Sequence, residues 1–263
     1  MQTLLGCFIV ISGCCFLLPS CGKKEPDVAP AASATALATS SASAKAIKFA
    51  VEAKGKTTID MPAPKERIKA DTEVMGGALE VDLTNLANTR GEVKVDLTTL
   101  KTKTFDDTAK NEAQTEHALT WLEVSDKSTP AMREQERWVV YAIRSIDGLS
   151  ATDIATVSPT KDGSDDVRTV TLTSHGEFLL HGHKIAKDAV LQAAFHYPAG
   201  AAADSKPTRV DIKTKTPLHI TLAEHEVKPR DPVGKLAQGS FSLLGTKVAN
   251  VADVSFELRA SPQ

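Results

Sequence analysis

Apolar and polar residues alternate along much of this chain, most regularly in two segments, 79–83 and 92–97. Successive side chains of a β-strand point to opposite faces, so a period of two predicts a half-buried strand. The polar faces of the two strands carry Glu80, Asp82 and Asp96. The apolar faces, predicted to point inward, carry Leu79, Val81, Leu83, Val93, Val95 and Leu97. Because a short polar stretch joins the two segments, we expect a β-hairpin.

Comparable segments recur on both sides of this hairpin and are separated by turn-rich loops. They predict further strands at 47–51, 56–61, 137–143, 167–173, 177–181, 189–197, 209–213, 218–223, 240–244 and 254–259.

One segment, 105–124, breaks the period of two. Its Ala109, Ala113, His117 or Ala118, and Trp121 follow the spacing of a helix face, and Asp106 or Asp107 is placed to cap its first turn. The stretch 125–130, which ends in proline, should terminate it. Many strands with one helix favour an antiparallel barrel or sandwich over βαβ units, and closure into a barrel removes exposed strand edges.

The first twenty residues have a different character. Residues 4–18 are apolar or small, too short a run for a membrane-spanning helix and about the length of the apolar region of a signal peptide. The run ends at Leu18-Pro19-Ser20-Cys21, which resembles the bacterial lipobox. We therefore expect 1–20 to be a removed signal peptide and Cys21 to be acylated. The n-region lacks Lys and Arg, and the alternatives are an ordinary secretory signal or a buried helix.

Cysteine usage agrees with this interpretation. All four cysteines lie within the first 21 residues, so the domain has no disulfide to form and must be stabilised by its core. Residues 21–46, rich in Ala, Ser, Thr and Pro, are predicted to be a disordered tether. The domain would then span 47–263. We expect a cell-envelope location, anchored in a membrane and facing the periplasm, with the outer membrane favoured.

Composition excludes one class of partner. The net charge is −2, with lysines and acids well mixed, so no basic face indicates nucleic acid.

Three segments together resemble the YceI-like family of periplasmic proteins. They are 77–102, with the repeated strand pattern ending in Val95-Asp96-Leu97-Thr98; 111–124, with His117-Ala118-Leu119; and 176–184, with Gly176, Gly182 and Lys184. The Arg-Asp pair that the family carries before its histidine is missing here. The resemblance implies an extended, antiparallel, lipocalin-like barrel, all-β with one short helix, that holds an isoprenoid or other long-chain lipid.

A barrel of about eight strands is wide enough to enclose one ligand. The residues proposed to line its interior are Leu79, Val81, Val93, Val95, His117, Trp121, Trp138, Val140, Phe178, Leu180, Leu191, Phe195 and Ile220. The alternative is that the same side chains simply fill the core. The protein would then be an envelope structural or interaction module, with an apolar patch near the long loop at 198–207. A homodimer and an envelope protein partner are both compatible with the sequence.

Other chemistry has little support. His181 and His183 would share one side of a strand and invite a metal site, but a third ligand would be needed from His175, His196 or His117. The resemblance also places the pair at a turn. No nucleophile, P-loop or dinucleotide motif is present. We therefore expect neither a cofactor nor an enzyme.

Overall fold

The computed structural model describes residues 43–62, 67–202, 204–228 and 249–263. The expected signal peptide, Cys21, most of the tether and the strand expected at 240–244 lie outside these ranges. None of the helices within them is long and apolar enough to cross a membrane.

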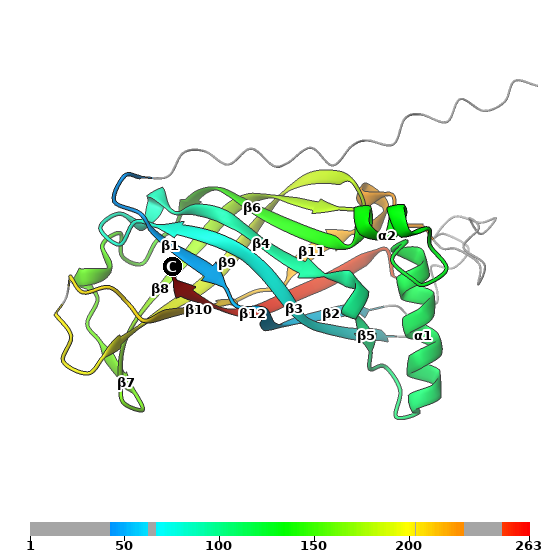
Figure 1. The fold of residues 1–263 in the computed structure, drawn as a ribbon, viewed down its shortest axis with the longest axis horizontal. Coiled ribbons are helices and arrows are strands. Elements are labelled where there is room, and N and C mark those ends of the chain that lie inside the picture. Colours follow the sequence, from blue (N-terminus) through cyan, green and yellow to red (C-terminus); the bar gives the residue numbers. More distant parts are fainter. Residues whose placement is uncertain (1–42, 63–66, 203, 229–248) are drawn as a thin grey trace, which may run out of the picture. The chain divides into compact units, whose positions relative to one another are not determined.

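Within these ranges, twelve strands form one sheet, and the pairs within it are antiparallel (Figure 1). They are β1 (Ile47–Val51), β2 (Lys54–Pro62), β3 (Arg67–Val81), β4 (Arg90–Asp96), β5 (Lys101–Thr102), β6 (Trp138–Asp147), β7 (Thr160–Asp162), β8 (Asp165–Leu180), β9 (His183–Pro198), β10 (Arg209–Thr214), β11 (Leu218–Thr221) and β12 (Val251–Pro262).

The sheet closes on itself. Its main path runs β12-β10-β9-β8-β6-β4-β3, and both β1 and β2 bridge β3 back to β12. Because β1 and β2 follow each other along the same gap, one completes the ring near one end and the other completes it farther along. The predicted all-β antiparallel barrel is thus confirmed, and each strand predicted within the described ranges lies in or overlaps a strand of the structure. The two strands expected at 167–173 and 177–181 are one continuous strand, β8.

The predicted hairpin is present as β3 and β4, and in its register Leu79 pairs with Gly91 and Gly77 with Val93. The acids at its strand ends differ from the expectation, because Asp82 and Asp96 are only 2% and 1% exposed. Each caps the turn after its strand. Asp82 Oδ1 accepts from the backbone N–H and hydroxyl of Thr84, and Asp96 Oδ1 accepts in the same way from Thr98. The carboxylates therefore bond to the turns that follow the strands and do not face solvent as the polar face of a strand would.

Asp96 also receives two hydrogen bonds from Arg137, at 2.7 and 2.9 Å. Burial by itself would raise the pKa of Asp96, but the bonds from Arg137 and Thr98 outweigh it and hold that pKa below its ordinary value. A lowered carboxyl pKa stabilises the fold above the unfolded-state pKa of about 4, and this contribution is lost as the pH falls through the folded-state pKa.

We expect Asp96→Asn to lower the free energy of unfolding at pH 7 by about 1–3 kcal/mol, because the charge-assisted bonds are lost. The variant should also lose less stability than wild type between pH 7 and pH 3. Urea denaturation at the two pH values measures both effects. Glu80→Gln is the control, since Glu80 makes only an exposed pair with Lys48 at 3.7 Å. An equal pH dependence in wild type and Asp96→Asn would contradict the assignment.

The described part of the chain has two α-helices beside the barrel. The predicted helix is α1 (Thr108–Trp121), and the side chain of Asp107 accepts from the backbone N–H of Lys110 as its N-cap. The second helix, α2 (Pro130–Glu136), was not predicted, so the expectation of a single helix is wrong. Its Thr129 caps the first turn and Pro130 occupies the first helical position. A proline there costs no hydrogen bond, so Pro130 begins a helix; α1 has already ended at Trp121.

The end of α1 is fixed to the turn between β8 and β9. Glu123 and His181 both have positive φ angles, 60° and 52°, and His181 Nε2 lies 2.6 Å from Oε2 of Glu123. Both side chains are mostly buried: that of His181 is 11% exposed and that of Glu123 is 16% exposed. This pair links the end of α1 to the end of β8, the strand that carries Phe178 and Leu180.

Candidate functional site

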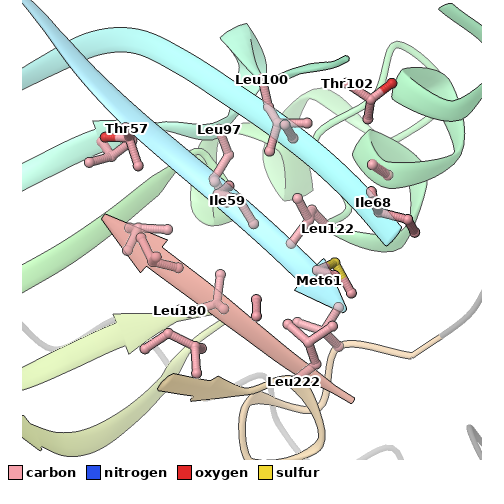
Figure 2. Close-up of a pocket in the computed structure, with 18 of the residues that line it drawn as sticks. Thr57, Ile59, Met61, Ile68, Leu97, Leu100, Thr102, Leu122, Leu180 and Leu222 are labelled. Carbon is pink, nitrogen blue, oxygen red and sulfur yellow. The ribbon is translucent and has the colours of Figure 1, made fainter. Parts of the chain in front are cut away.

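The barrel encloses a cavity of about 510 Å³ (Figure 2). Its lining residues come from α1 and from the strands β2 to β6, β8, β11 and β12, with the short segments that follow some of them. Most lining side chains are apolar: Ile59, Met61, Ile68, Ala70, Val93, Val95, Leu97, Leu100, Phe105, Ala113, Ala118, Trp121, Leu122, Val139, Phe178, Leu180, Leu218, Ile220, Leu222, Val227, Ala252, Val254 and Phe256. The polar lining residues are Thr57, Thr102, Lys110, Gln114, His117 and Tyr141.

Helix α1 marks the mouth of this cavity. Among the described lining residues, those that are also exposed to solvent are Lys110, Ala113 and His117. All three lie on α1, spaced three and four residues apart, so they share one helix face. Figure 1 shows α1 at one end of the barrel, near β5 and α2. The mouth is therefore bordered by a cation and a histidine, and the interior beyond it is lined almost entirely by carbon.

The other end of the barrel is filled by side chains. Phe49 is fully buried, and Leu79, Ile154, Val170, Tyr197 and Val210 are each no more than 2% exposed. None of these lines the cavity. The barrel is packed at one end and hollow at the other. The alternative of a structural module requires an interior that is filled throughout. Within the described ranges the exposed large apolar side chains are Val190 and Val251, neither in the loop at 198–207.

Tyr141 lies where the strands β6, β8 and β9 meet at the cavity wall. Its hydroxyl lies 2.8 Å from the carbonyl oxygen of Ser174 and 3.1 Å from that of Lys187. Burial raises the pKa of Tyr141 to about 12, so the phenol stays protonated and donates to these carbonyls. Gly176 makes room for the ring: a Cβ at this position would lie 2.5 Å from Cζ of Tyr141. The tyrosine thus seals the wall with its polar atom already satisfied.

The structure brings together part of the residue set proposed from sequence. The cavity wall contains Val93, Val95, His117, Trp121, Phe178, Leu180 and Ile220. Four others, Leu79, Val81, Leu191 and Phe195, point inward but belong to the packed end. Alternation identified their face correctly but placed them in the wrong half of the barrel.

Trp138 and Val140 were assigned to the wrong face of β6. Their neighbours Val139 and Tyr141 line the cavity instead. Alternate residues of a strand face opposite ways, so Trp138 and Val140 belong to the outer face. Trp138 lies there under the guanidinium of Arg137, 4.9 Å from the ring centroid. The run from 138 to 143 is entirely apolar, and nothing in its pattern fixes the register.

Sequence reasoning missed the contribution of β2 and β12. Thr57, Ile59 and Met61 follow one another along β2, and Ala252, Val254 and Phe256 do so along β12. Both strands were predicted, and their alternation was a usable signal. The two strands pair with each other although they are nearly two hundred positions apart in the chain, and no local pattern predicts such a pairing.

The histidines do not form a metal centre in the part of the chain that the structure describes, where no group of three or more potential ligands converges. His181 pairs with Glu123, and His183 lies at the other side of the β8–β9 turn. His225 is fully buried; burial lowers its pKa, and its Nδ1 lies 3.3 and 3.2 Å from the carbonyl oxygens of Leu180 and His183.

The sequence matches no family model and no curated protein. Solved structures similar to the chain include one described as a polyisoprenoid binding domain from Saccharophagus degradans implicated in plant cell wall breakdown. It is 11% identical, with a TM-score of 0.49, and the match covers 82% of this chain and 99% of that one. BcnA from Burkholderia cenocepacia is 10% identical, with a TM-score of 0.45, covering 79% and 96%.

Proposed function

We propose that this chain is a lipid-binding protein that holds an isoprenoid or another long-chain lipid inside the barrel. The observation that carries the proposal is the cavity: about 510 Å³ of space, lined by apolar side chains and opening beside α1. This volume lies within the range of about 300–1,000 Å³ typical of small-molecule sites. The family resemblance of the sequence implies the same class of ligand.

The shape of the site favours an elongated apolar molecule over a compact polar one. Its walls are lined mostly by apolar side chains, and its charged lining residue, Lys110, lies on α1 at the mouth. Each methylene that leaves water for such a cavity contributes about 0.8 kcal/mol. A chain therefore gains affinity in proportion to the length that it inserts.

The two tryptophans provide a direct test. Trp121 lines the cavity, whereas Trp138 lies on the outer face of β6. We expect titration with farnesol or oleic acid to change the fluorescence emission of the protein. The change should persist in Trp138→Phe and disappear in Trp121→Phe, because only the indole of Trp121 contacts the inserted chain.

Native mass spectrometry of the same three proteins separates loss of signal from loss of binding. Trp121→Phe should still bring the lipid into the gas phase. A response that depends on Trp138, or the absence of bound lipid from wild type and from an organic extract of the purified protein, would contradict the proposal.

We also propose that the protein works tethered to a membrane in the bacterial envelope, through diacylated and N-acylated Cys21, and that it is not an enzyme. The support is in the sequence: the apolar leader, the lipobox-like ending and a body without cysteine. Two or more acyl chains give stable anchoring. Cys21→Ser should release the protein from the membrane fraction, and the mass of the mature wild-type N-terminal peptide should include the acyl groups. An unmodified Cys21 would overturn this part alone.

A further inference from the structure

Lys110 is the charged residue of the cavity wall. Among the lining residues within the described ranges it is the one lysine or arginine, and none is an aspartate or a glutamate. It lies on α1 at the mouth, and its side chain is 67% exposed. Lys110 therefore borders both the apolar interior and the solvent.

The acidic side chains of α1 and its cap lie outside the cavity wall. Asp107, Glu112 and Glu116 belong to this segment, and none of them lines the cavity. Oδ2 of Asp107 lies 4.0 Å from Nζ of Lys110, and both side chains are more than half exposed. Because an exposed ion pair of this kind contributes little to stability, it leaves the ammonium group of Lys110 able to move to another anion.

The stability of α1 does not explain a lysine at this position. Lys110 is the third residue of the helix and lies in its first turn, which contains no acidic residue. The macrodipole of a helix favours negative side chains at this end and disfavours positive ones. The cation therefore stands where the helix gains least from it and where the cavity opens to solvent.

Farther into the cavity, a charged group of a ligand would have no counter-charge. The wall there is mostly apolar, and the hydroxyls of Thr102 and Tyr141 already donate to backbone carbonyl oxygens, each at 2.8 Å. A charge buried without a partner is far more costly than one that stays in water. A lipid with one charged end would therefore insert its chain and keep the charged end at the mouth, beside Lys110.

We propose that the bound lipid ends in an anionic oxygen group, a carboxylate or a phosphate, that pairs with the ammonium group of Lys110 at the mouth while its chain lies inside the barrel. A lysine suits this boundary because its carbon stem packs beside an apolar chain while its ammonium group stays in water. This inference rests on the proposed lipid-binding function and specifies the chemistry of its ligand.

The test compares probes that share one carbon skeleton, namely farnesol, farnesoate and farnesyl phosphate, by calorimetry at about pH 8, where the carboxylate is ionised. Wild type should bind at least one of the anions about three- to tenfold more tightly than farnesol, and added salt should narrow this preference. Lys110→Met should bind the three probes with similar affinity, and Lys110→Arg should keep the preference. Whichever anion binds more tightly identifies the headgroup as carboxylate or phosphate.

Lys127→Met is the matched control. Lys127 is also an exposed lysine that pairs with an acid of α1, with its Nζ 3.0 Å from Oε1 of Glu116, but it does not line the cavity. This variant should keep the preference of wild type for the anion.

If wild type binds farnesol as tightly as both anions, or if Lys110→Met and Lys127→Met lose the preference equally, the inference is overturned while lipid binding stands. Failure of wild type to bind any of the three probes would instead count against the proposed function, and the inference would fall with it. Thermal unfolding of the ligand-free variants checks the fold, and we expect little change because Lys110 is exposed. The headgroup preference of wild type and its salt dependence test the inference without any variant.

Discussion

Replacing Val254 with tryptophan should abolish lipid binding while the barrel stays folded. Val254 lies on β12, paired with Ile59 on β2 and Leu218 on β11, and its partly exposed side chain lines the cavity. An indole there occupies space that the lipid chain would fill. If four methylenes are excluded, the loss is about 3 kcal/mol at about 0.8 kcal/mol each, which is a reduction in affinity of more than about a hundredfold.

The folded state should tolerate this change because the site is hollow. Adding atoms to a well-packed core usually costs about 1–3 kcal/mol through strained rotamers, but an empty space accepts them without that strain. We therefore expect a urea midpoint close to that of wild type. Native mass spectrometry or calorimetry with farnesol should measure the binding, since the added tryptophan complicates fluorescence.

Val190→Trp is the matched control. Val190 is also a strand valine, but it is 38% exposed on β9. The same substitution should leave farnesol binding unchanged. If Val254→Trp binds like wild type, or if both variants lose binding equally, the cavity is not the lipid site.

The sequence predicts a lining residue correctly where polar neighbours in the same strand show which face of that strand points inward. Alternation with polar residues fixes a strand face, and so Val93 and Val95 were placed correctly. The apolar run of β6 carries no such constraint, and there the choice of Trp138 and Val140 over Val139 and Tyr141 was one residue out of register. Only the pairing of β6 with β4 and β8 sets that register, and this is a tertiary property.

A side chain that points into the barrel does not necessarily line the cavity. Leu79 and Val93 follow the same pattern on paired strands, yet Leu79 is in the packed end and Val93 borders the cavity. The difference comes from what fills the space opposite. Near Leu79, β1 places Phe49 into the interior, whereas farther along the barrel β2 places Thr57 and Ile59 there. Side-chain volume across the barrel, summed over several strands, decides where the hollow lies.

The two helices of the described residues differ in how well the sequence predicts them. Asp107 gives α1 a recognisable start, and its prediction was correct. Pro130 was interpreted only as a stop, although Thr129 before it makes the pair a helix start as well. A short helix with few apolar residues leaves no periodic pattern to reveal it.

The difference between the two ends of the barrel can be measured with two phenylalanines. Phe49 is fully buried at the packed end and is the register partner of Leu79. Phe256 lines the cavity, and its side chain is only partly buried. Phe49→Ala should lower the free energy of unfolding by about 3–5 kcal/mol, because it removes a large apolar group and leaves a new void among packed neighbours. For a domain whose total stability is of the order of 5–15 kcal/mol, that is a large share.

Phe256→Ala should cost less than half as much in the ligand-free protein, since a ring beside an existing cavity has fewer neighbours to lose. Its main effect should be on the lipid. A saturating lipid stabilises the folded state in proportion to its affinity, and this gain should be smaller in Phe256→Ala than in wild type. Urea denaturation with and without farnesol measures both quantities for the two variants. Equal costs for the two substitutions without lipid would mean that the interior is uniformly packed, and the hollow end on which lipid binding depends would not exist in solution.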